Sequence, residues 1–150
     1  MVYLAERVMA LHLLSIGALL WAGMIIGISF LESWVKFKTP TLSKLVGLEV
    51  GRTVFHSFHQ VQIALLFFLI VVYVLHAPSL LNSMFFGILI SVVLLQVFWV
   101  FPILCQRVDE LAKGKKPPYS FAHTVYGIGE LVKFFVLLAL GIQGCEIVLT

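Results

Sequence analysis

The chain has 150 residues, of which 61% are hydrophobic and 11% are charged, and its formal net charge is +3. Soluble domains are about 45–50% apolar and about 25% charged, so this composition excludes an ordinary soluble domain and indicates an integral membrane protein. The basic residues lie mostly in short connections, which membrane topology explains better than nucleic-acid binding does. We therefore expect the lipid bilayer as the main partner, and no nucleic acid.

Four apolar segments are long enough to cross a bilayer, which takes about 20 helical residues. We expect helices at about 9–30, 50–75, 80–104 and 121–149. Each of the three connections contains proline, where helix breakers belong. The first apolar run has no small-residue cleavage site after it, so we interpret it as a retained helix. The expected fold is all-α: an integral membrane four-helix bundle, up-down-up-down, as one transmembrane domain over residues 1–150.

Lysine and arginine gather in two of the connections. In 31–49 and 105–120 these basic residues are Lys36, Lys38, Lys44, Arg107, Lys113, Lys115 and Lys116. The connection between the second and third helices has none. Because cytoplasmic loops carry an excess of Lys and Arg, we expect both basic loops in the cytoplasm and both termini outside.

The first expected helix carries a polar residue near each end. Glu32 lies at the cytoplasmic end, where it would frame the mouth of a polar site. His12 lies near the outer end, where it is either an axial haem ligand or an interfacial histidine with ordinary hydrogen bonds. Gly23 and Gly27 form a GxxxG pattern, which indicates a close helix contact inside the bundle or a dimer face.

The second helix has one polar face. Arg52, His56, His59 and Gln62 are spaced by three or four residues and descend from the cytoplasmic side. The two histidines could hold a metal, but hydrogen bonding within a polar cluster is the simpler interpretation. On the third helix, Gln96 lies in the same cytoplasmic half.

The fourth helix has a matching face made of His123, Tyr126, Glu130 and Lys133. A charge at the centre of a bilayer helix costs about 2.5–3.5 kcal/mol on insertion scales. Glu130 and Lys133 are three residues apart and within reach of each other. The pair is therefore either a structural ion pair that fixes helix packing or a site for a ligand, an ion or a proton.

Ionisable groups in membranes nearly always face the bundle interior or a watery cavity. The polar faces of the second and fourth helices therefore predict a shared polar pocket in the cytoplasmic half. The chain has no CxxC pattern and no Cys/His cluster, so we predict no metal site.

Two stretches resemble a group of short bacterial four-helix membrane proteins of unknown function. They are F-L-E-x-x-V-K-F-x-x-P at 30–40 with V-G-R-x-V-F at 50–55, and Pro102-x4-Arg107 with H-x-x-Y-x-x-x-E-x-x-K at 123–133. The resemblance implies a four-helix membrane fold and a bacterial inner membrane, and names no activity.

At greater distance, Leu11-His12 with Ala18, Trp21 and Gly23 resembles the first helix of the HemJ and CopD membrane units. HemJ proteins are haem-associated protoporphyrinogen oxidases, and CopD proteins are linked to copper. This resemblance implies that His12 would match a haem-binding histidine.

The leading hypothesis is a small polytopic membrane protein, not an enzyme, that binds or moves a small solute, an ion or a proton without a cofactor. Glu130 would titrate or bind the cation with Lys133 as its charge partner, and His56 and His59 would relay or hydrogen-bond. One alternative is a membrane oxidoreductase with haem b or quinone, using His12. Another is a non-catalytic subunit of a larger membrane complex. A homo-oligomer is compatible with each.

Overall fold

The computed structural model describes residues 2–76 and 79–146, and the backbone alone at 2–5, 76 and 144–146. Within these residues every regular element is a helix. In chain order they are α1 (Val2–Met24), η1 (Ile25–Glu32), α2 (Ser33–Val35), η2 (Lys36–Lys38), α3 (Lys44–His76), α4 (Leu80–Leu95), η3 (Gln96–Val100), α5 (Phe101–Ala112) and α6 (Ala122–Glu146).

Consecutive elements join into four helical spans that are long and apolar enough to cross a membrane. The spans are Glu6–Lys38, Lys44–Leu75, Leu80–Ala112 and Ala122–Gln143. The prediction of an all-helical chain with four such helices is confirmed.

The beginning of the third span and its end are set by ordinary capping residues. Ser79 precedes α4 and its side chain accepts a hydrogen bond from the backbone N–H of Asn82 at 3.2 Å, as an N-cap serine does. After α5, Gly114 adopts a φ of +73°, a left-handed conformation in which glycine carries no steric penalty. The chain then passes through the proline-containing connection to α6.

Two of the expected connections are shorter than hydropathy indicated. The first helical span continues to Lys38 and α3 already begins at Lys44, so most of 31–49 is helical. Likewise α5 continues to Ala112, inside the expected connection 105–120. Hydropathy marks only the part of a helix that is suited to lipid. Beyond that part, side-chain pairs four residues apart support the helix, and Glu32 and Lys36 form such an ion pair at 3.1 Å.

The starts of the first and last helices differ from each other in outcome. α1 begins at Val2, seven residues before the expected start at 9, whereas α6 begins at Ala122, within one residue of the expected 121. The last expected helical residues, 147–149, lie outside the described residues.

Two spans contain a stretch of π-helix, a wider turn that is rare and often found at functional sites. In the third span, η3 ends two residues before Pro102. Proline has no backbone N–H, and its ring crowds the carbonyl four residues earlier, at Phe98, so a wide turn here has a clear cause. In the first span, η1 contains Gly27 and no proline.

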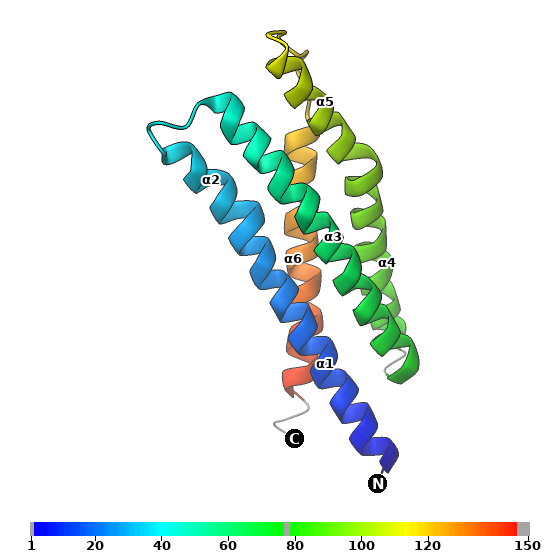
Figure 1. The fold of residues 1–150 in the computed structure, drawn as a ribbon. Helices are drawn as coiled ribbons and strands as arrows, with labels where there is room; N and C mark the ends of the chain where they lie inside the picture. The colour runs from blue at the N-terminus through cyan, green and yellow to red at the C-terminus, as the bar shows by residue number, and fades with distance from the viewer. Residues whose placement is uncertain (1, 77–78, 147–150) are drawn as a thin grey trace.

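The start of α1 and the end of α6 lie at one end of the molecule, while α2, the start of α3 and α5 lie at the other (Figure 1). α1 packs against α6 and α3, and α4 packs against α6. The contacts are close: a Cβ on Gly17 would lie 2.7 Å from Leu69, and one on Gly141 would lie 2.6 Å from Leu19. The main apolar core, which includes Trp21 and Leu137, fills the space between these helices.

Candidate functional site

Lys133 of α6 is completely enclosed, with no side-chain exposure. Its Nζ donates hydrogen bonds to Glu130 Oε1 at 2.8 Å and to Gln62 Oε1 of α3 at 2.5 Å. The three-residue spacing on one helix sets the first contact. Thus the ion pair that the sequence indicated is present, and it is direct.

Glu130 is equally enclosed, with 1% of its surface exposed. Besides Lys133, its Oε1 accepts from Gln96 Nε2 of η3 at 3.1 Å. Its Oε2 accepts from Ser29 Oγ of η1 at 2.9 Å. Charge-assisted bonds of this kind are stronger than neutral ones, so both carboxylate oxygens are held by protein donors.

We call Ser29, Gln62, Gln96, Glu130 and Lys133 the buried network. Each of the four spans contributes at least one of these side chains. The residues that approach Glu130 from the first and third spans, Ser29 and Gln96, both lie in π-helical segments. The wide turns therefore occur where two spans reach the same carboxylate.

A second hydrogen bond, and the space left by a glycine on α6, hold the Gln96 amide in position. Its Nε2 also donates to the backbone carbonyl of Tyr126 at 3.0 Å. On Gly129 a Cβ would lie 2.8 Å from Gln96 Nε2 and 3.2 Å from Val92 Cγ1. The missing side chain at 129 thus gives the Gln96 amide its room.

His59 and Tyr126 form a buried pair between the network and the basic end of the molecule. The Tyr126 hydroxyl and His59 Nε2 are 3.0 Å apart and share a hydrogen bond. The His59 ring meets Phe101 edge-on at 4.6 Å between centroids, and Tyr126 meets Phe55 edge-on at 5.2 Å. Both rings are therefore fixed by aromatic packing.

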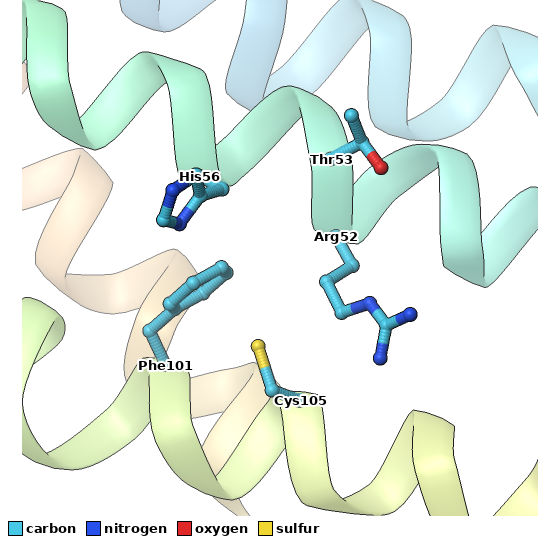
Figure 2. Close-up of a pocket in the computed structure, with 5 residues that line it drawn as sticks. All are labelled: Arg52, Thr53, His56, Phe101 and Cys105. Carbon is cyan, nitrogen blue, oxygen red and sulfur yellow. The ribbon is translucent and has the colours of Figure 1, made fainter.

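An open hollow of about 270 Å³ lies between α3 and α5 near the basic end, and we call it the α3–α5 hollow. It is lined by Arg52, Thr53, His56, Phe101 and Cys105. Figure 2 shows the His56 ring over the Phe101 ring on one side, Arg52 on the other, and the Cys105 thiol pointing up between them. Arg52 Nη1 pairs with Asp109 Oδ1 of α5 at 2.5 Å.

The structure brings together six of the predicted site residues and leaves others apart. His59, Gln62, Gln96, Tyr126, Glu130 and Lys133 are buried together. By contrast, His123 is exposed, so its expected place on the interior face is wrong. His56 is exposed too, and with Arg52 it lines the α3–α5 hollow instead of the network. Glu32 pairs with Lys36 instead.

Three residues of this arrangement were not predicted: Ser29, Gly129 and Asp109. A signal existed for Ser29, since it lies one turn before Glu32 in the polar half, but serine is too common in helices to single out. Nothing in the sequence pointed to Gly129 or to Asp109 as the partner of Arg52.

The GxxxG pattern does not mediate packing inside the chain. Gly23 and Gly27 are exposed, and a Cβ on either would meet no atom within 4 Å. The interpretation as a contact inside the bundle is wrong, and the dimer face stays a prediction.

His12 lies on α1, far along the chain from the network, with its Nδ1 2.8 Å from the Val8 carbonyl oxygen. Its ring nitrogen is therefore within hydrogen-bond distance of a backbone carbonyl of its own helix, and the haem role of His12 stays a prediction. Among the described residues, no three of His, Cys, Asp and Glu converge as metal ligands do.

No protein family, curated protein or solved structure matches this chain.

Proposed function

We propose that the protein is an integral membrane four-helix bundle, up-down-up-down, in which the buried network binds and moves a proton. The carrying observation is Glu130, an enclosed carboxylate bonded at both oxygens to donors from three spans and linked through Lys133 to the fourth. Ionisable residues inside membranes are costly and mark ion or proton pathways by default.

The exposed surface supports membrane insertion. Only 22–39% of the residues in the four apolar windows are buried within the chain. Large apolar side chains such as Phe67, Met84 and Phe98 stand outward at 60–75% exposure. Soluble proteins rarely expose an apolar patch of this extent to water, whereas lipid would cover it.

The distribution of basic residues supports the orientation. With loops 31–49 and 105–120 in the cytoplasm and both termini outside, Glu130 lies eight residues after the start of α6 at Ala122. At 1.5 Å per residue that is about 12 Å from the cytoplasmic end, within the cytoplasmic half of the bilayer. A bacterial inner membrane is the location that this arrangement and the family resemblance suggest.

The donors around Glu130 favour a proton over a larger solute. A metal cation at the carboxylate would have to displace the Lys133 ammonium, which is 2.8 Å away and of like charge. A proton needs only a shift within existing hydrogen bonds. Gln96 Oε1 has no partner among the described residues, so a flip of the amide would let it accept a hydrogen bond from a protonated Glu130.

Side chains that can exchange protons lie between the α3–α5 hollow and Glu130. His56 at the α3–α5 hollow and the buried His59 both contact the Phe101 ring, and His59 bonds to Tyr126. Tyr126 lies one helical turn before Glu130 on α6. A histidine ring has two nitrogens that can accept and donate a proton, which suits it to pass a proton along this line.

Proton flux in liposomes tests this function. The wild type, Glu130→Gln, Lys133→Met and the double variant are reconstituted with an internal pH dye, and a potassium diffusion potential drives proton entry. Each single variant leaves one buried charge unpaired and should lose about 3–5 kcal/mol of stability. The double variant should regain stability, because neither charge remains, yet carry no proton flux.

A second candidate is supported by the directness of the Glu130–Lys133 contact. An enclosed ion pair of 2.8 Å is what a structural lock needs, and a bundle locked in this way would suit a non-catalytic subunit of a larger membrane complex. On this function the wild type carries no flux above empty liposomes, while the stability pattern of the variants is the same. Wild-type flux in the double variant would contradict the proton function outright.

A further inference from the structure

A polar stripe follows the outer face of α3 from the basic end into the span. It consists of Arg52, His56 and Gln60, spaced by four residues, so each lies about 6 Å deeper than the one before. His56 and Gln60 are exposed, and the Arg52 side chain is 36% exposed. On a lipid-facing helix, exposed polar groups at this depth need a partner.

The stripe adjoins the α3–α5 hollow. Figure 2 shows the Arg52 side chain reaching across from α3 toward α5, with His56 over Phe101 one turn deeper. Phe98 lies three residues before Phe101, deeper in the same span, and is 75% exposed. A cation therefore lies above neutral donors, and these lie above an apolar aromatic surface.

We propose that the hollow and the stripe bind one anionic phospholipid, with its phosphate at Arg52, its glycerol ester region at His56 and Gln60, and an acyl chain along Phe98. This inference rests on the membrane insertion in the proposed function and adds a specific lipid as partner. The order of charged, polar and apolar groups along the stripe matches the order of groups in such a lipid.

Arg52 is the cation in the lining of the α3–α5 hollow, and its ion pair with Asp109 leaves donors for an anion. A guanidinium has five N–H donors, and Asp109 occupies Nη1 of Arg52. The Asp109 side chain is 55% exposed, so the ion pair is screened by solvent and is easily exchanged for a phosphate. Phosphate binds arginine through two parallel N–H bonds. Phosphatidylglycerol keeps its net negative charge, whereas the choline cation of phosphatidylcholine offsets the phosphate charge that Arg52 would pair with.

Native mass spectrometry of the full-length protein extracted in mild detergent tests the inference. Phosphatidylglycerol, phosphatidylcholine and glycerol 1-phosphate are added separately, and occupancy is measured against lipid concentration. Phosphatidylglycerol should bind the wild type more tightly than phosphatidylcholine. Arg52→Gln should weaken phosphatidylglycerol binding about tenfold, since it removes a charge-assisted pair.

Lys113→Gln is the matched control. Lys113 is an exposed cation at the same end of the molecule as Arg52, and it lies outside the lining of the hollow. This control should change the affinity for phosphatidylglycerol by no more than about twofold. An equal loss of affinity in Arg52→Gln and Lys113→Gln would show diffuse electrostatic attraction and overturn the site. Equal binding of the two lipids would overturn it as well, as would saturation by glycerol 1-phosphate alone. A dimer that dissociates in Gln60→Leu would show that a second copy covers the stripe.

The two proposals fail separately. A protein recovered in the soluble fraction would contradict membrane insertion, and the lipid site with it. A protein that stays in the membrane fraction and carries flux, but shows no preference between the lipids, would contradict the lipid site alone.

Discussion

Gly129 determines how closely the third and fourth spans approach at the buried network. In Gly129→Ala the new methyl would lie 2.8 Å from Gln96 Nε2, so the amide must leave Glu130 or the helices must separate. Loss of a hydrogen bond to a charged group costs about 1.5–3 kcal/mol. We expect this variant to unfold more easily in detergent, as measured by thermal or denaturant unfolding.

Gly127→Ala is the control for this prediction. It is two residues away on the same helix, and its Cβ would meet no atom within 4 Å. Because alanine is about 1 kcal/mol better than glycine in a helix interior, the control should be neutral or stabilising. If both variants behave alike, the approach of Gln96 to Glu130 contributes nothing measurable.

At the scale of the element, the π turn η3 positions Gln96, and Pro102 maintains the turn. In Pro102→Ala the helix regains a backbone donor and the crowding at Phe98 is relieved, so the ordinary α-helical pitch becomes favourable. The side chain of Gln96, at the start of η3, would then rotate away from Glu130. We expect Gln96→Leu to cost about 1 kcal/mol less in the Pro102→Ala background than in the wild type.

A double-mutant cycle on unfolding free energies measures this coupling, which for neighbouring residues is about 0.5–3 kcal/mol. Costs that add within about 0.5 kcal/mol would mean that the π turn and the Gln96 contact are independent.

The spans and most of the network could be predicted because both follow from periodic patterns. Apolar length gave the four helices, and spacing with depth grouped Gln62, Gln96, Glu130 and Lys133. The predicted place of His56 in the buried network was wrong. Residues three apart differ by about 60° around a helix, so a broad polar face has one edge inside the bundle and one edge outside. The π turns leave no mark in hydropathy, and without them neither Ser29 nor Gln96 could be assigned to the Glu130 carboxylate.

At the scale of the whole molecule, the two ends differ in charge, and this difference predicts how the bundle crosses the membrane. The end formed by α2, the start of α3 and α5 carries most of the basic residues. At the other end, near the start of α1, Glu6 and Arg7 are the two charged residues in 1–31 (Figure 1). Positive loops stay in the cytoplasm. We therefore expect Lys115 inside and Glu6 outside.

Labelling with a membrane-impermeant maleimide tests this orientation in intact bacterial cells, after Cys105 and Cys145 are replaced by serine. A cysteine at position 6 should react in intact cells, and a cysteine at position 115 only after permeabilisation. Because four spans place both termini on one side, a cysteine at position 150 should behave like the one at position 6. The reverse pattern would put Glu130 in the outer half and the α3–α5 hollow on the outer surface, so the direction of the proposed proton path would invert while its residues stay the same.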